Sequence, residues 1–302
     1  MRNQARMQTA VLVANSGARQ TAEALARART MLVERGVRLT HTDIVDNHED
    51  LCRCVRRAAR RRRQLVIVAG GDGTMTAAVG QLAKTKSVLG VLPLGTGNSF
   101  ALSLGIADLE TAVDAIVAGR VVSIDLGKVN GTYFANFATI GLSSAIARAT
   151  PNALKKVIGA AAYVLAGLLP AFRSRPFRCK VRAGKERIAF RTYQVIVANG
   201  RYFGHTPLTP EASLDSGRLI FYSTSDATIV DAAKTYTSLL LDRQGLLSNA
   251  HVLEAKELRV RARPAQALAI DGEQCGRTPA RFRVVPGALR VMVPAVTPAG
   301  AP

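Results

Sequence analysis

The chain has 302 residues, of which 48% are hydrophobic and 21% are charged. These proportions are typical of a globular protein and exclude an intrinsically disordered one, and the length suffices for two domains. The 41 Lys and Arg residues exceed the 21 Asp and Glu residues, which gives a formal net charge of +20. A surface of this charge attracts polyanions, whether nucleic acid, an anionic bilayer or an anionic substrate.

We expect neither a membrane span nor a secretory signal. The nearest candidate for a span, residues 157–172, is interrupted by two glycines and a proline, and the apolar run 10–14 is too short for a signal peptide. The four cysteines are scattered, and no second pair accompanies Cys52 and Cys54 at zinc-binding spacing. The sequence therefore predicts a cytosolic protein with reduced thiols.

Apolar runs alternate with helical patterns over the first 120 residues or so. The runs that favour strands are 10–14, 37–40, 65–69 and 88–92, and the segments that favour helices are 22–34, 51–61 and 108–117. This alternation predicts an α/β domain with a doubly wound parallel sheet, whose ligands bind at the carboxyl ends of the strands.

Strand-like segments dominate after residue 122. They are 132–139, 179–182, 193–198, 219–222, 258–263, 268–270 and 282–285, with two helices expected at 154–169 and 229–241. We therefore expect a nucleotide-binding domain at 1–125, a β-rich, sandwich-like domain at 126–296, and a disordered tail at 297–302.

Two glycine-rich turns follow strands of the first domain. The first is Gly70-Gly71-Asp72-Gly73-Thr74, after the apolar run 65–69 and before a helix-compatible stretch. Glycines allow an anion to approach the backbone N–H groups closely, and a helix N-terminus adds unpaired donors. The turn is therefore suited to phosphate, but the Asp72 carboxylate would repel it unless a cation intervenes. That favours a nucleotide bound with Mg²⁺.

The second turn is Pro93-Leu94-Gly95-Thr96-Gly97-Asn98. Gly95 and Gly97 permit close backbone approach, Thr96 offers a hydroxyl, and Asn98 can cap the next helix or bind a substrate hydroxyl. One G-x-G alone often marks only a tight turn. Two such turns at neighbouring strand ends favour a nucleotide site far more strongly.

Further motifs follow in a characteristic order. They are the basic-then-G-x-x-A-Y pattern in 154–163, N-G-x-x-x-G in 197–204, P-x-A-x-x-D-x-G-x-L in 210–219, and D-G-E in 271–273. With the two glycine-rich turns, this set resembles the diacylglycerol kinase catalytic family, which includes sphingosine kinases and bacterial lipid kinases. The resemblance covers roughly residues 10 to 294 and implies a first domain like that of NAD kinases and phosphofructokinases.

The resemblance also implies roles for individual residues. Residues 70–74 would bind the ATP phosphates with Asp72 serving the Mg²⁺–nucleotide complex, and Thr96, Gly97 and Asn98 would complete the nucleotide and acceptor site. Asn15 would lie near the nucleotide, as would a threonine after the second strand, either Thr40 or Thr42. Glu273 resembles the family's proton acceptor, with Asp271 as its partner or rival, although Asp-Gly alone is also a common hairpin signal.

One departure concerns a structural metal. Where the family has D-D-G, this chain has Asp215-Ser216-Gly217. The family's side-chain ligand therefore falls on Ser216, flanked by the carbonyls of Ser213 and Arg218. Serine is a poorer, uncharged Mg²⁺ ligand. We expect this site to be lost, weakened, or rescued by Asp215.

The sequence thus predicts an ATP- and Mg²⁺-dependent lipid kinase that phosphorylates a lipid hydroxyl such as that of diacylglycerol. Its basic surface, including the arginine-rich segment 53–63, would associate peripherally with an anionic membrane, although that segment can equally be a solvated helix face. Specific nucleic-acid binding is disfavoured because aromatics do not interleave with the arginines. A homodimer is compatible with the sequence. The alternatives are an NAD kinase-like enzyme and a non-catalytic lipid- or nucleotide-binding protein.

Overall fold

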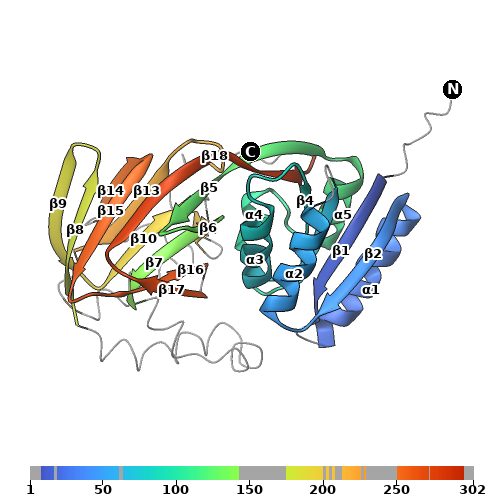
Figure 1. Ribbon diagram of the computed structural model, residues 1–302, viewed down its shortest axis with the longest axis horizontal. Coiled ribbons are helices and arrows are strands. Elements are labelled where there is room, and N and C mark those ends of the chain that lie inside the picture. Colours follow the sequence, from blue (N-terminus) through green and yellow to red (C-terminus); the bar gives the residue numbers. More distant parts are fainter. Residues whose placement is uncertain are drawn as a thin grey trace. The chain divides into compact units, whose positions relative to one another are not determined.

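The computed structural model describes residues 8–16, 19–60, 64–142, 175–199, 202–203, 206–207, 213–225, 228, 250–271 and 273–295 (Figure 1). Several sequence-based predictions lie outside these residues. They are the helices 154–169 and 229–241, the motif 154–163, parts of the motifs at 200–204 and 210–212, Gly272 of D-G-E, Arg61 to Arg63, and the tail 297–302.

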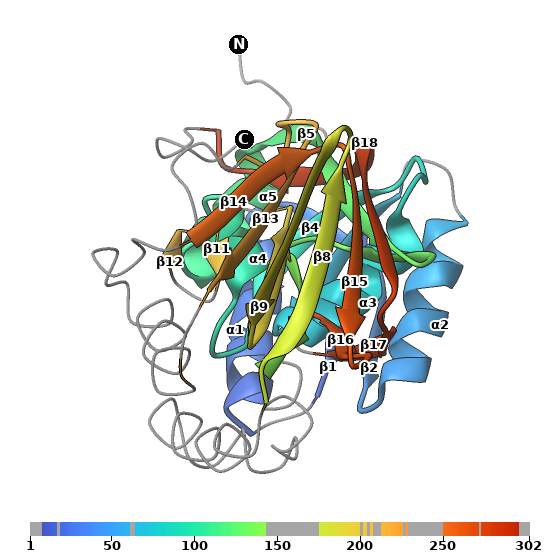
Figure 2. The same ribbon diagram turned by 90° about the vertical axis from the view of Figure 1, so that its left-hand side faces the viewer.

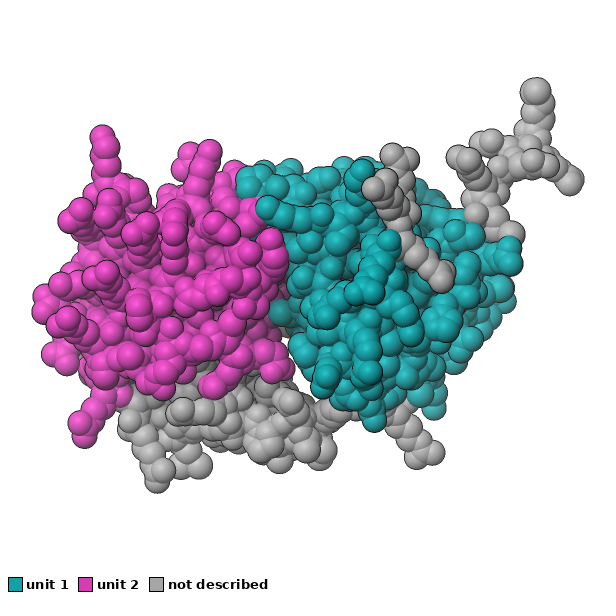
Figure 3. All heavy atoms as spheres, in the orientation of Figure 1, with its two compact units in different colours: residues 1–126, 213–215, 286–302 teal, residues 127–212, 216–285 magenta. Residues whose placement is uncertain are grey.

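The chain divides into two compact units (Figure 3). Unit 1 comprises residues 1–126, 213–215 and 286–302, and unit 2 comprises 127–212 and 216–285. The first division falls close to the predicted boundary at 125/126. Residues 286–302 return to unit 1, whereas the sequence placed 286–296 in the second domain.

Unit 1 is an alternation of strands and helices (Figure 1). The elements are β1 (Gln8–Asn15), α1 (Arg19–Glu34), β2 (Val37–Val45), α2 (His48–Ala59), β3 (Leu65–Gly70), α3 (Asp72–Leu82), β4 (Val88–Pro93), α4 (Ser99–Ser103), α5 (Leu109–Ala118) and most of β5 (Arg120–Val129). The strands β2, β1, β3 and β4 are neighbours in that order and run parallel. The predicted doubly wound sheet is confirmed.

Local sequence explains how these elements begin and end. Every residue of β3 is buried, as its continuous apolar run predicts. Helix α2 begins at His48, three residues earlier than expected, because the Asn47 side chain caps it by accepting the Asp50 N–H at 2.8 Å. Strand β2 extends to Val45 despite its polar residues, because it is the sheet's edge strand and one side meets solvent.

Unit 2 is built mainly from antiparallel strands (Figure 2). They are β6 (Thr132–Phe134), β7 (Phe137–Gly141), β8 (Phe177–Ala183), β9 (Glu186–Thr192), β10 (Gln194–Ala198), β11 (Tyr202–Phe203), β12 (Thr206–Pro207), β13 (Leu219–Thr224), β14 (Ala250–Ala255), β15 (Glu257–Arg263), β16 (Ala267–Ile270), β17 (Glu273–Arg277) and the first part of β18 (Ala280–Val293).

Two layers of these strands enclose one core. One layer has the order β18-β15-β8-β9, and the other has the order β14-β13-β10-β7-β16-β17. Phe177 and Phe282 from the first layer and Phe221 from the second belong to the same buried cluster. The β-rich, sandwich-like second domain is therefore confirmed.

Strand β18 takes part in both units. Its first part pairs antiparallel with β15 of unit 2, whereas Arg290 and Val291 pair in parallel with Val88 and Leu89 of β4 in unit 1. The sequence predicted only 282–285 as a strand. Among the described residues, no helix is long and apolar enough to span a bilayer.

Candidate active site

The two glycine-rich turns lie at neighbouring carboxyl ends of the parallel sheet. In the register of β3 and β4, Gly70 stands opposite Pro93, and the Leu94 N–H donates to the Gly70 carbonyl at 3.0 Å. Helix α3 starts at Asp72, immediately after the first turn. The first N–H groups of a helix have no acceptor within the helix, so this edge of the sheet offers donors and a positive dipole end to an anion.

Glycine is needed where the two turns meet. A Cβ atom added to Gly95 would lie 2.5 Å from the Cα atom of Gly71, and one added to Gly71 would lie 3.2 Å from the Cα of Gly95. A Cβ on Gly70 would lie 2.5 Å from the Thr74 Oγ1. Because these contacts involve backbone or a buried side chain, the backbones approach as closely as they do only with glycine at both turns.

Asp72 joins the two turns. Its Oδ1 accepts the Phe100 N–H at 3.2 Å, at the beginning of α4. Its Oδ2 would lie only 2.9 Å from a Cβ on Gly97. The carboxylate that looked out of place in a phosphate site therefore also satisfies a backbone donor at the start of α4, just after the second turn, a role that the sequence did not reveal. The presence of a helix start just after the second turn was the available signal.

Asn98 closes the second turn on itself. Its Oδ1 accepts the Gly95 N–H at 2.9 Å and its Nδ2 donates to the Gly95 carbonyl at 2.8 Å. Its backbone is left-handed, with φ 48°, and its side chain makes no capping hydrogen bond to α4. The helix-capping alternative for Asn98 is thus wrong, because its side-chain amide is bonded to Gly95 instead. Thr96, between them in sequence, is exposed.

Asn15, at the end of β1, lies at the same edge of the sheet as Gly70 and Pro93, which end β3 and β4. It is the last residue of β1, and its Nδ2 donates to the Thr74 Oγ1 at 3.3 Å. Thr74 itself is 7% exposed and lies in the first turn of α3, as does Gly73. The structure therefore unites Asn15, both glycine-rich turns and Asp72 in one region of unit 1.

Neither candidate threonine of β2 reaches this region. Thr40 lies at an irregularity between the pairs Ala10–Leu39 and Val11–His41, and its Oγ1 donates to the Ala10 carbonyl at 3.1 Å. Thr42 pairs with Leu12, in the middle of the strand. The carboxyl edge comes later, where Val45 pairs with Asn15.

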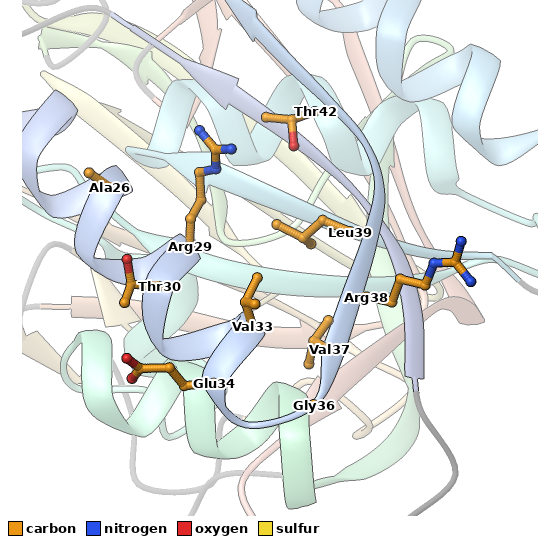
Figure 4. Close-up of a pocket in the computed structure, with 10 residues that line it drawn as sticks. All are labelled: Ala26, Arg29, Thr30, Val33, Glu34, Gly36, Val37, Arg38, Leu39 and Thr42. Atoms are coloured by element: carbon orange, nitrogen blue, oxygen red, sulfur yellow. The ribbon is translucent and has the colours of Figure 1, made fainter.

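Two cavities lie along β2. The larger, of about 780 Å³, lies between α1 and β2 (Figure 4), and its lining residues are Ala26, Arg29, Thr30, Val33, Glu34, Gly36, Val37, Arg38, Leu39 and Thr42. The smaller, of about 300 Å³, is lined in part by Thr40. Neither lining includes a residue of the glycine-rich turns.

The two carboxylates of the D-G-E motif differ in their surroundings within unit 2. The Asp271 carboxylate accepts the Phe137 N–H at 2.9 Å, and its own N–H donates to the Phe137 carbonyl at 3.0 Å. Asp271 also has a left-handed backbone, with φ 45°. Glu273 is exposed and begins β17, where it pairs with Ile270 across the hairpin. Asp271 is thus bound to the sheet, whereas Glu273 faces solvent.

The predicted metal ligands lie in the turn 213–218. The Ser213 hydroxyl donates to the Asp215 carboxylate, and the Ser216 Oγ lies 3.3 Å from both the carbonyl and the N–H of Arg218. Asp215 supplies the turn's single carboxylate. Among the described residues, no group of three or more His, Cys, Asp or Glu could hold a metal ion. The turn thus offers Mg²⁺ one carboxylate together with hydroxyl and carbonyl oxygens.

Comparison with known proteins matches both halves of the chain. The family model for the diacylglycerol kinase catalytic domain matches residues 9–129, and the model for the YegS C-terminal NAD kinase beta sandwich-like domain matches residues 137–293. The chain belongs to the diacylglycerol kinase catalytic-domain family. Membership makes it a phosphotransferase whose phosphate donor is ATP.

Relatives in this family cover most of the chain. A probable lipid kinase YegS-like of Pseudomonas aeruginosa is 33% identical, covering 94% of this chain and 92% of its own. A diacylglycerol kinase of Bacillus subtilis is 32% identical over 77% of this chain and 78% of its own. A putative diacylglycerol kinase structure from Bacillus anthracis shares the fold, with a TM-score of 0.79 at 23% identity over 97% of this chain and 98% of that one.

The contact between the two turns yields a prediction. Gly95→Ala places a methyl group 2.5 Å from the Gly71 Cα, which cannot move aside without shifting β3. Turnover should fall by about 10²-fold, the typical effect of a 1 Å displacement at an active site. ATP affinity, measured by calorimetry, should fall with it.

Gly80→Ala is the matched control, since Gly80 lies in α3 and a Cβ there meets nothing within 4 Å. This variant should keep full activity and gain up to about 1 kcal/mol of stability from helix propensity. Equal turnover in the two variants would show that the close approach of the turns is irrelevant to catalysis.

Proposed function

We propose that this protein transfers the γ-phosphoryl group of ATP, bound as its Mg²⁺ complex, to the hydroxyl of a lipid such as diacylglycerol. The proposal rests on one observation. Two glycine-rich turns, the N-terminus of α3 and the Asp72 carboxylate lie together at one edge of the sheet. Relatives named diacylglycerol kinase and probable lipid kinase support the lipid acceptor.

The backbone N–H groups of the first glycine-rich turn and of the start of α3 would hold the nucleotide. Glycine at Gly70, Gly71 and Gly73 lets phosphate oxygens reach N–H groups, and the dipole of α3 favours their negative charge. Asp72 is suited to Mg²⁺ that arrives with a nucleotide, since such ions are typically held by one or two carboxylates together with phosphates. When bound, the ion neutralises charge on the transferred phosphoryl group.

The two carboxylates of the D-G-E motif would have separate roles. A lipid hydroxyl must lose its proton as it attacks, and a carboxylate within hydrogen-bond reach can accept that proton. Asp271 is bonded to the Phe137 backbone, whereas Glu273 extends from the start of β17 and is exposed. We therefore assign proton acceptance to Glu273 and the positioning of the hairpin to Asp271.

A transfer assay tests the proposal directly. Radiolabelled ATP is supplied with diacylglycerol, phosphatidylglycerol, sphingoid bases, ceramide or NAD, and the product is identified by mass spectrometry. Transfer to a lipid that disappears in Asp72→Asn is the expected result, because the variant keeps an acceptor for the Phe100 N–H but loses the charge. Transfer to NAD alone would establish the NAD kinase alternative, and transfer to none would favour a non-catalytic binding protein.

Replacing Glu273 and Asp271 separately tests the division of roles. Glu273→Gln should lower kcat by about 10²- to 10⁴-fold, the usual contribution of a general base, with an unchanged unfolding temperature. Asp271→Ala leaves the Phe137 N–H unpaired and should cost about 1–3 kcal/mol in denaturant unfolding. Asp271→Asn, which keeps an acceptor, should restore that stability and retain most of the turnover. A loss in Asp271→Asn as large as that in Glu273→Gln would reverse the assignment.

We further propose that the turn 213–218 binds Mg²⁺ only weakly, because Ser216 supplies no charge. Ser216→Asp adds a second carboxylate beside Asp215 and should make the unfolding temperature rise on addition of Mg²⁺, since an ion that binds only the native state stabilises it. The unmodified protein should respond much less, and Ser216→Ala should behave like it. An equal Mg²⁺ response in all three proteins would contradict the weakened site.

A further inference from the structure

The outer face of one layer of unit 2 is almost entirely basic. In the layer β18-β15-β8-β9, alternate residues point into the core and are buried, and the residues between them point outward. The outward positions are Arg281 and Arg283 of β18, Glu257, Arg259, Arg261 and Arg263 of β15, Arg178, Lys180 and Arg182 of β8, and Arg187, Ala189 and Arg191 of β9. We call this set the basic sheet face; Figure 2 shows its four strands.

The strand register places like charges directly opposite one another. Arg261 faces Lys180, and Arg263 faces Arg178, between β15 and β8. Between β8 and β9, Arg182 faces Arg187. Directly opposed side chains have Cβ atoms about 5 Å apart, and like charges in such pairs destabilise a sheet. The fold therefore gains nothing from this arrangement.

A single acidic side chain offsets this charge within the described part of the face. Glu257 bonds Arg281 at 2.7 Å and Arg259 at 3.0 Å. Hydrogen bonds from Arg281 and then Arg259 lower the pKa of the Glu257 carboxyl to about 2, so it is ionised at physiological pH. Arg283 stands opposite Glu257 in the register, whereas Arg261, Arg263, Lys180 and the basic residues of β8 and β9 face no acidic side chain among the described outward positions.

An anionic lipid bilayer fits this surface better than nucleic acid does. The face is a broad array of about 15 by 20 Å, as strand spacings imply, and a membrane presents negative headgroups over a plane of any size. Single-stranded nucleic acid needs aromatic side chains on which bases stack, and the outward positions carry none. Sequence-specific duplex recognition places a helix or strand ribbon in a groove, which a four-stranded face is too wide to enter.

We propose that the basic sheet face docks the protein on the surface of an anionic membrane. The proposal rests on the proposed function, in which the acceptor is a lipid. Opposed arginines that cost stability in solution gain favourable partners when anionic headgroups lie against them. Because exposed charges are screened, the attachment is reversible and weakens as salt rises.

Arg261→Glu tests the proposal without risking the fold. The new carboxylate faces Lys180, so an opposed like-charge pair becomes an ion pair and the unfolding temperature should rise. Sedimentation with phosphatidylglycerol-containing vesicles in 0.15 M salt should nevertheless weaken by about 30-fold, since two units of charge change near the surface. Vesicles of phosphatidylcholine alone should bind neither protein.

Two further variants complete the design. Glu257→Gln should have the opposite effects, binding anionic vesicles about fivefold more tightly while losing its ion pairs and some stability. Arg60→Glu, at the end of α2 in unit 1, makes the same charge change as Arg261→Glu outside the face. Its vesicle binding should change by less than about threefold.

Three outcomes would overturn the proposal: equal losses in Arg261→Glu and Arg60→Glu, no vesicle binding by the unmodified protein, or binding of duplex DNA or RNA in its place. Kinase activity on lipid in neutral detergent micelles separates this proposal from the proposed function. There Arg261→Glu should match the unmodified protein. Absence of transfer by the unmodified protein would refute the proposed function, whereas the sedimentation results need no ATP and stand by themselves.

Discussion

The contact between the backbones of Gly71 and Gly95 is the constraint on which unit 1 depends for its candidate active site. It sets the separation of the carboxyl ends of β3 and β4, and so the position of every donor at the start of α3. No side chain lies between these two backbone segments, because both residues are glycine. The Asp72–Phe100 hydrogen bond then fixes α4 against the same contact. Binding residues are thus positioned by main-chain packing, which tolerates less adjustment than contacts between flexible side chains.

In each unit, the carboxylate of an aspartate accepts a hydrogen bond from a backbone N–H group of another element. Asp72 accepts the Phe100 N–H in unit 1, and Asp271 accepts the Phe137 N–H in unit 2. Each is an acid from a motif associated with chemistry, and each is also bonded to a backbone group at the end of a neighbouring element. A carboxylate held in this way keeps one orientation, which is what an active site requires of it. Removal of such an acid therefore affects structure and chemistry together, and charge-neutral isosteres are needed to separate the two effects.

Much of the fold was predictable because apolar runs such as Leu65–Ala69 favour buried parallel strands wherever they occur. Strands with few apolar residues were harder to predict than those in which apolar and charged residues alternate regularly, such as β15. Strand β9 (Glu186–Thr192) and strand β17 (Glu273–Arg277) carry few apolar residues, and only their partners identify them as strands. The predicted site residues at strand ends, such as Asn15, came together because parallel strands finish at one edge. Thr40 did not, because β2 continues to Val45.

A charged surface, like a strand with few apolar residues, can be hard to recognise from the sequence alone. The arginines of segment 53–63 attract attention because they cluster in sequence, yet Arg57 bonds Asp43 at 2.9 Å and Arg53 pairs with Asp50. The basic sheet face is dispersed over more than a hundred residues of sequence, at alternate positions of four strands, and only the register brings Arg261 beside Lys180. A helix can pair its charges within one turn, whereas Glu257 is the single acid among the described outward positions of the basic sheet face. The number of charges in a short stretch of sequence is therefore a weaker guide to a docking surface than the scarcity of acids across neighbouring strands.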